Sequence, residues 1–264
     1  MKKKYLVIGS PINHSLSPKL HNYWFSKTDV QATYEKKELK LEDLENIISD
    51  LKNDKISGLN VTVPFKKNII SFIDELSSDA KESQSVNTIY KKGNKILGHN
   101  TDIAGFELGL RHINFDIKNK KVLILGAGGV VPSIILGLEK LGSSEITLSN
   151  RTQENVESLK KTFKYIKSIK WGETIDFDVI INATSIGLKN DEDFIIDYSD
   201  GKSGKFFYDV IYNPRKTKFL EKAEKKGNKI ENGKMMFIYQ AHQSFTLWHN
   251  IMPKIDNETI ELLD

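Results

Sequence analysis

A lysine and an aspartate in two polar segments could form an acid/base pair. Lys66 ends the segment Asn60–Lys66 (NVTVPFK), just beyond a predicted strand, where open α/β sheets place their ligands. An ammonium there can stabilise and protonate an alkoxide, and neutral Lys66 can remove an alcohol's proton. If the fold places Asp102 beside it, the carboxylate would hold the ammonium in place. Two simpler interpretations stay open, because Lys66 next to Lys67 could be solvated and Asp102 could merely cap a helix.

Hydroxyl and amide side chains in separate segments could bind the oxygens of a small ligand. Asn60 and Thr62 lie on one face of their predicted strand, because strand side chains alternate. Ser15 and Ser17 precede a predicted helix, where hydroxyls can cradle a carboxylate. Ser17 followed by Pro18 fits an N-cap and first-turn pair equally well, so both interpretations remain.

A glycine-rich turn between a strand and a helix predicts a dinucleotide site. Residues 122–125 form an apolar run typical of a buried parallel strand, and Gly126–Gly129 follow at once. Glycines let the backbone approach a pyrophosphate, and the N-terminus of the following helix, which stops at Gly142, offers free N–H groups. Val131 stands where a third small residue is usual, so a loop that binds something else, or nothing, is the alternative.

The end of the next predicted strand favours a phosphorylated ribose. Strand 145–149 runs into Asn150, Arg151 and Thr152. An NAD site normally has an acidic residue there to hold the ribose 2′-hydroxyl, whereas an arginine suits a 2′-phosphate. Arg151 can pair bidentately with phosphate and stack on adenine. We therefore predict an NADP(H) site, with a solvated arginine as the simpler alternative.

Composition narrows the class of protein. The 264 residues, 39% hydrophobic and 28% charged, suit a globular protein of one large domain or two modest ones. Lysines are spread along the chain and the net charge is only +4, so we expect no nucleic-acid partner. The lack of cysteine excludes disulfides and thiolate chemistry, and no spacing suggests a metal site. No apolar run could span a membrane, so we expect a cytoplasmic protein that acts on a small molecule.

Hydrophobic patterns predict alternating strands and helices, as in an α/β protein. The predicted strands cover 5–8, 33–39, 56–63, 85–90, 95–99, 122–125, 145–149, 165–171, 177–181 and 206–211. The predicted helices cover 19–26, 41–51, 103–112, a segment from the glycine turn to 141, 156–163, 217–226 and 235–250.

Taken together, these segments resemble the shikimate dehydrogenase family over essentially the whole chain. The matching segments are Ser15–Pro18, His21 with Asn22, Asn60–Lys66, Val86–Thr88, Asn100–Asp102, Gly126–Gly129, Asn150–Thr152, Asn182–Thr184, Asp209–Pro214, and Gln240 with Ala241. The resemblance implies an N-terminal α/β substrate domain of residues 1–103, completed by C-terminal helices 235–264. It implies a Rossmann-like, doubly wound nucleotide-binding domain over 104–234.

The reaction that the resemblance implies is the reversible NADPH-dependent reduction of 3-dehydroshikimate to shikimate in aromatic amino-acid (chorismate) biosynthesis. Lys66 would be the catalytic acid/base, aided by Asp102. The implied substrate-binding residues are Ser15, Ser17, Asn60, Thr62, Asn87, Tyr212 and Gln240. The implied NADP(H)-binding residues are Gly126, Ala127, Gly128, Gly129, Val130, Asn150, Arg151, Thr152, Thr184, Val210 and Gly233. A monomer and a homodimer are both compatible with this interpretation.

A few positions depart from the family pattern. Gln84 and Ser85 replace a usual Gly-Ala pair, and Ile103 follows Asp102 where glycine is common. Glu154 stands where relatives often carry a second basic residue, and a carboxylate there would weaken a preference for NADP.

Two rival functions remain at this stage. One is a dehydrogenase of the same fold that also uses quinate, with NAD or both cofactors. The other is a non-catalytic NADP-binding regulator, against which the presence of both Lys66 and Asp102 argues.

Overall fold

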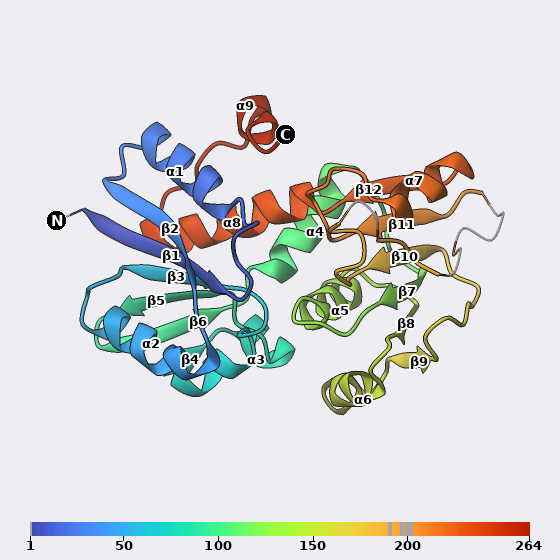
Figure 1. Ribbon diagram of the computed structural model, residues 1–264, viewed down its shortest axis with the longest axis horizontal. Helices are drawn as coiled ribbons and strands as arrows, with labels where there is room; N and C mark the ends of the chain where they lie inside the picture. Colours follow the sequence, from blue (N-terminus) through green and yellow to red (C-terminus); the bar gives the residue numbers. More distant parts are fainter. Residues whose placement is uncertain (1, 190–191, 196–197, 199–202) are drawn as a thin grey trace. The chain divides into compact units, whose positions relative to one another are not determined.

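The computed structural model describes residues 2–189, 192–195, 198 and 203–264, and the chain forms two compact units. The first comprises the residues up to Gly105 together with Ile238–Asp264, and the second comprises Phe106–Phe237. Both divisions fall inside helices, α4 (Asp102–His112) and α8 (Lys234–His249), which Figure 1 labels. Within the described residues, each unit contains one six-stranded sheet.

The sheet of the first unit brings the ends of four strands, β1, β3, β5 and β6, to one edge. Its strand order is β2-β1-β3-β5-β6-β4 (Figure 1). The strands are β1 (Lys3–Gly9), β2 (Ala32–Glu38), β3 (Gly58–Val61), β4 (Glu75–Leu76), β5 (Thr88–Lys92) and β6 (Lys95–His99). β1 is parallel to β2 and β3, whereas β5 is antiparallel to β3 and to β6. The carboxyl ends of β1, β3 and β6 therefore share an edge with the amino end of β5.

Helices cover both faces of this sheet. The helical elements of the first unit, besides parts of α4 and α8, are α1 (Ser17–Lys27), η1 (Leu41–Asp43), α2 (Leu44–Lys52), η2 (Asn68–Phe72), α3 (Ser78–Ser83) and α9 (Asn257–Glu261). On one face α2 buries an apolar stripe in the same cluster as Leu6 and Ile8 of β1. On the other face Tyr5 packs against Phe25 of α1 and Trp248 of α8. This alternation along β1 is the two-residue period of a strand buried on both sides.

The second unit is a doubly wound parallel sheet. All neighbouring strands are parallel, in the order β12-β11-β10-β7-β8-β9. Its strands are β7 (Lys121–Leu125), β8 (Glu145–Ser149), β9 (Lys167–Ile169), β10 (Val179–Asn182), β11 (Phe206–Asp209) and β12 (Lys229–Asn232). Besides parts of α4 and α8, its helices are α5 (Val131–Lys140), α6 (Gln153–Thr162) and α7 (Lys218–Lys225). The chain proceeds from β7 to β9 on one side and then from β10 to β12 on the other. The carboxyl ends of β7 and β10 thus flank the switch point where such sheets bind ligands.

The predicted α/β fold is confirmed, and the differences concern short or weakly patterned elements. The elements that the sequence analysis missed are η2, β4, α3, β12 and α9. Strand 85–90 begins only at Thr88, and helix 41–51 opens with the 3-10 turn η1. β12 (Lys229–Asn232) is a short, mostly polar edge strand, so its sequence carries little apolar alternation.

The turn after β7 explains why a glycine stands at 126. Gly126 has φ +115°, and a Cβ there would lie 2.8 Å from the Ala183 carbonyl oxygen that follows β10. Gly128 in the same turn has no such constraint, because its Cβ would lie 4.0 Å from that oxygen. Only the first of these two glycines is required by the backbone itself.

We predict that Gly126→Ala lowers the free energy of unfolding by about 2–4 kcal/mol, because an alanine must adopt a strained backbone and displace a neighbouring carbonyl. Gly128→Ala is the matched control and should change that free energy by less than about 1 kcal/mol. Chemical denaturation of the variants checks this. Equal losses for both would contradict the account of the turn.

Candidate active site

A buried ion pair lies at the shared edge of the first sheet. The Lys66 ammonium is 2.5 Å from the Asp102 carboxylate, and the two side chains are only 10% and 8% exposed. Lys66 follows the carboxyl end of β3, and its carbonyl accepts a hydrogen bond from the Val86 N–H at 2.9 Å. Burial of two charges is costly unless they pair and their remaining groups are hydrogen-bonded. The solvated-lysine interpretation of Lys66 is therefore wrong.

Asp102 does not cap helix α4. Asn100 does so instead: its Oδ1 accepts hydrogen bonds from the Asp102 N–H at 3.0 Å and the Ile103 N–H at 3.3 Å. The Asp102 carboxylate is thus left for other partners, and it takes Lys66 on one oxygen and Asn87 Nδ2, at 2.9 Å, on the other. Both oxygens of this buried carboxylate therefore accept hydrogen bonds from charged or amide donors.

Asn87 connects the ion pair to the sheet and to α8. Its Oδ1 accepts from the Thr101 N–H at 2.8 Å, which fixes the amide so that Nδ2 faces Asp102. Gln240 Oε1 of α8 lies 3.5 Å from the same Nδ2. The structure therefore brings four of the predicted site residues together: Lys66, Asn87, Asp102 and Gln240.

The predicted carboxylate-binding serines lie in the loop after β1 and at the start of α1. Ser15 and Ser17 are 9% and 7% exposed, and the Ser15 hydroxyl donates to Ser17 Oγ at 3.2 Å. The interpretation of Ser17 as the N-cap is wrong, because α1 begins at Ser17 itself and Leu16 occupies the cap position without a side-chain bond. Pro18 does stand in the first turn, as predicted.

Thr62 follows β3 next to this loop. A Cβ added at Gly9 would lie only 2.5 Å from the Thr62 methyl carbon, so this methyl group occupies the space beside Gly9. Its hydroxyl has no hydrogen-bond partner among the residues that the structure describes, and the side chain is half-buried. A half-buried hydroxyl of this kind can accept or donate to a ligand.

Behind Asn87 lies a set of buried hydroxyls that the sequence analysis did not single out. Thr88, Thr101 and Ser244 form a triangle with oxygen separations of 2.7, 3.2 and 3.2 Å. Asn60 Nδ2 donates to Thr88 and Ser244, each at 3.0 Å. Ser244 lies one helical turn beyond Gln240 on α8, and this spacing is the one sequence signal that could have indicated it.

In the second unit, the loops after β7 and β8 contain the predicted cofactor residues. Residues 126–130 form the turn before α5, and Val131 begins that helix fully buried. Asn150 donates to the Thr152 carbonyl at 2.7 Å, which shapes the turn into α6. The side chain of Arg151 is exposed, as is that of Glu154 in the first turn of α6. An exposed guanidinium at this strand end can reach a phosphate.

The loops after β10 and β11 are tied by a buried amide–carboxylate contact. Asn182 Nδ2 donates to Asp209 at 3.0 Å, and Asn182 Oδ1 accepts from the Thr184 hydroxyl at 2.8 Å. Asp209 also accepts from the Thr217 hydroxyl at 2.6 Å and the Ile211 N–H at 3.0 Å. Burial raises the pKa of Asp209 to about 6, although these donors oppose the shift. Thr184 is thereby held in a fixed place beside the switch point.

The remaining predicted residues follow β11 and β12. Val210 is half-buried, and a Cβ on Gly233 would lie 2.0 Å from its carbonyl oxygen, so no other residue fits at 233. Tyr212 stacks on Phe237 with ring centroids 4.4 Å apart, both in the second unit. Its contact with a substrate stays a prediction.

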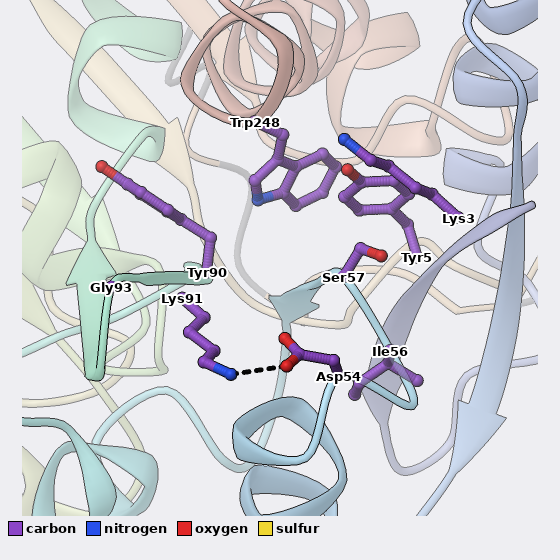
Figure 2. Close-up of a pocket in the computed structure, with 9 residues that line it drawn as sticks. All are labelled: Lys3, Tyr5, Asp54, Ile56, Ser57, Tyr90, Lys91, Gly93 and Trp248. Carbon is purple, nitrogen blue, oxygen red and sulfur yellow. Dashed lines mark hydrogen bonds and ion pairs between the residues drawn. The ribbon is translucent and has the colours of Figure 1, made fainter. Parts of the chain in front are cut away.

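A separate hollow of about 420 Å³ lies in the first unit, and Figure 2 shows it between Tyr90, Trp248 and Lys91. Lys3 and Ser57 also line it, at the amino ends of β1 and β3. The ion pair follows the opposite, carboxyl end of β3. This hollow is therefore not the site that contains Lys66. Among the described residues there is also no metal-binding group of acidic, histidine or cysteine side chains, and no helix long and apolar enough to cross a bilayer.

These features define a class: two-domain α/β enzymes with a Rossmann-like nucleotide-binding domain. Residues 7–89 match the family description "Shikimate dehydrogenase substrate binding domain", and residues 107–215 match "Shikimate / quinate 5-dehydrogenase". The chain belongs to the shikimate dehydrogenase family.

Individual relatives are similar to this chain over all or nearly all of its length. A protein of Pelagibacter ubique (strain HTCC1062) named shikimate dehydrogenase (NADP(+)) is 60% identical over 264 residues, which cover 100% of both chains. The crystal structure of shikimate dehydrogenase from Aquifex aeolicus matches with a TM-score of 0.91 and 34% identity, over 99% of this chain and 97% of that one. A shikimate dehydrogenase crystallised in complex with NADP+ matches with a TM-score of 0.90 and 32% identity, over 99% and 93%.

We predict that Asp102→Leu destabilises the protein by about 3–5 kcal/mol, because it leaves the Lys66 ammonium buried without a counter-charge. The double variant Lys66→Met with Asp102→Leu removes both charges and should recover most of that loss. Denaturant unfolding of the single and double variants checks this. A double variant no more stable than Asp102→Leu would show that the buried charge is not the cause.

Proposed function

We propose that this chain catalyses the reversible NADPH-dependent reduction of 3-dehydroshikimate to shikimate, with Lys66 as acid/base. The observation that carries the proposal is the buried pair of Lys66 and Asp102 at 2.5 Å, on the edge of the sheet where strand ends gather. Family membership supports the reaction. Of the relatives named above, the Pelagibacter ubique protein is named shikimate dehydrogenase (NADP(+)), and one crystallised shikimate dehydrogenase is in complex with NADP+.

The first unit would bind the substrate. Ser15 and Ser17 supply two nearly buried hydroxyls for its carboxylate, at the start of α1 where the helix adds partial positive charge. Thr62, Asn87 and Gln240 supply hydroxyl and amide groups for its ring oxygens. A site that hydrogen-bonds hydroxyls discriminates strongly against analogues that lack them.

Proton transfer follows from the ion pair. The second unit would hold NADPH at the Gly126 turn and Arg151, and the cofactor would supply the hydride for reduction of the ketone to an alkoxide. Lys66 Nζ donates the proton that this alkoxide needs, and its charge stabilises the developing oxyanion. Asp102 holds Nζ in a fixed direction through one carboxylate oxygen, while Asn87 holds the other. In the reverse direction the neutral amine removes the proton of the alcohol.

The residues of the second unit fit an NADP(H) molecule. The positive-φ turn at Gly126 presents backbone without a Cβ at the N-terminus of α5, as a pyrophosphate requires. Arg151 would bind the 2′-phosphate, and Thr184, Val210 and Gly233 would lie at the nicotinamide end. Gly233 has no room for a Cβ, which keeps the backbone there close-packed.

We predict that Lys66→Ala lowers kcat by about 10²–10⁴ with little change in the KM for shikimate, because it removes a general acid/base rather than a binding group. The measurement is NADPH formation from shikimate and NADP+, with quinate and NAD assayed in parallel to define the substrate and cofactor range. Lys67→Ala, at the adjacent exposed lysine, is the control and should keep the wild-type rate. Near-normal turnover by Lys66→Ala would remove this residue from the role.

We predict that Arg151→Ala raises the KM for NADP+ about tenfold and leaves the KM for NAD unchanged, because it removes a charge-assisted contact that only the 2′-phosphate can make. Glu154→Gln should lower the KM for NADP+ modestly, since it removes a like charge from the same turn. Initial rates against each cofactor measure both effects. Equal changes for NADP+ and NAD would argue against a phosphate contact.

A further inference from the structure

The hollow shown in Figure 2 has no part in the proposed reaction, although its size and lining are those of a binding site. Its volume of about 420 Å³ falls within the range of small-molecule pockets, roughly 300–1,000 Å³. The lining comes from the start of β1, the segment before β3, the end of β5 and α8. Small-molecule sites typically combine apolar or aromatic walls with a few polar groups that fix the orientation of the ligand.

Two aromatic rings form a fixed wall of the hollow. The rings of Tyr5 and Trp248 have their centroids 4.8 Å apart and are tilted by 32° (Figure 2). Trp248 Nε1 donates to the Ile89 carbonyl at 3.3 Å, which holds the indole in place. Gly58 leaves room for both rings, because a Cβ there would lie 2.9 Å from Trp248 Nε1 and from the Tyr5 ring. The wall is thus formed before any ligand binds, and it offers contacts to a further ring.

The hydroxyl of Tyr5 lacks an acceptor. The side chain lines the hollow and is only 2% exposed, yet its hydroxyl has no hydrogen-bond partner in the described part of the chain. Burial raises the pKa of Tyr5 to about 12, so the group remains a hydroxyl at neutral pH and can donate. A nearly buried donor without a protein acceptor costs free energy unless a molecule in the hollow accepts from it.

A cation lies next to this hydroxyl. Lys3 is on the same face of β1 as Tyr5, because strand side chains alternate, and both line the hollow. The Lys3 ammonium has no ion-pair partner among the residues that the structure describes. Burial, and then the charge of Lys3, lower the pKa of His249 to about 4, and the His249 ring lies 5.0 Å from that of Tyr5. An unpaired ammonium and a free hydroxyl donor therefore occupy the same part of the hollow.

The carboxylate that lines the hollow is already in use. Asp54 lies 2.7 Å from Lys91 Nζ, which also donates to the Lys52 carbonyl at 2.8 Å (Figure 2). The described lining contains two lysines and this one aspartate, so it carries a net charge of +1. Such a lining attracts an anion and repels a cation.

We propose that this hollow is a second small-molecule site, which binds an aromatic carboxylate. The ring of the ligand packs against Tyr5 and Trp248, and its carboxylate accepts from the Lys3 ammonium and the Tyr5 hydroxyl. The site lies at the amino end of β3, whereas Lys66 follows the carboxyl end of that strand. A ligand in the hollow therefore does not compete with a molecule bound at the ion pair.

The test is a titration of the full chain with 3-phenylpropanoate, a single ring on a short acid, followed by the NMR signals of the ligand. We expect a Kd of about 1 mM or tighter, as the small size of this probe allows. The neutral 3-phenylpropanamide should bind about tenfold more weakly because it lacks the charge, and hexanoate about threefold more weakly because it lacks the ring. Equal binding of the amide or of hexanoate overturns the proposed ligand class.

Variants locate the binding. Tyr5→Phe keeps the ring and should weaken 3-phenylpropanoate binding about tenfold, because it removes one hydrogen bond to a charged acceptor. Lys3→Ala should weaken binding about threefold, since an exposed ion pair is worth less. Lys2→Ala removes a neighbouring exposed lysine that does not line the hollow, and this matched control should keep the wild-type Kd.

Two results overturn this site. One is a wild-type Kd in Lys3→Ala or in a folded Tyr5→Phe, and the other is displacement of 3-phenylpropanoate by saturating shikimate, which would place the probe at the ion pair. The site does not depend on the proposed reaction. A chain without shikimate-dependent NADPH formation would overturn the proposed function and leave these binding results unchanged.

Discussion

The need to compensate two buried charges governs the first unit of this protein. Lys66 and Asp102 lie almost out of contact with water, where each charge alone would cost several kcal/mol. Their attraction offsets this cost only because two other side chains complete the arrangement. Asn87 donates to the second oxygen of the carboxylate, and Asn100 caps α4, so that the Asp102 side chain is not used as the cap. Three separate segments, which contain Lys66, Asn87 and Asn100–Asp102, come together at one sheet edge to satisfy this requirement.

The second unit contains a buried carboxylate without a cation, and the contrast is informative. Asp209 accepts from Thr217, Ile211 and Asn182 but has no lysine or arginine among its contacts in the described structure. Its pKa accordingly rises to about 6 under burial. We infer that this carboxylate serves to fasten two loops, whereas the carboxylate of the first unit serves to hold a charged amine.

Much of the fold was predictable because its strongest elements carry strong patterns. The run 122–125 and the glycines after it indicated β7, its turn and α5, and the buried strands up to 206–211 were located within a few residues. β12 and α9 were missed because a short polar segment at a sheet edge or chain end has little apolar periodicity. The capping interpretations left open at Ser17 and Asp102 are wrong, and the sequence could not exclude them because several residues near each helix start were chemically able to cap.

The residues of the ion pair were indicated by the resemblance of their segments to a family, but the groups that orient them were not. Thr88, Thr101 and Ser244 come from three different elements, and nothing in the local sequence shows that their hydroxyls meet. Contacts between distant segments depend on sheet register, which a single sequence does not specify.

The amide of Asn87 has a consequence for how the site is reset after each turnover. An amide nitrogen donates hydrogen bonds but does not release a proton in exchange for another, so Asn87 and Asn60 interrupt any proton wire through the interior. The proton that leaves Lys66 therefore cannot be replaced through the interior of the protein, on the side of Asn87 and Asn60. The next proton must reach Lys66 from the side of the amine that faces solvent. A bound ligand that covers that side would limit the enzyme to one proton transfer each time a ligand binds.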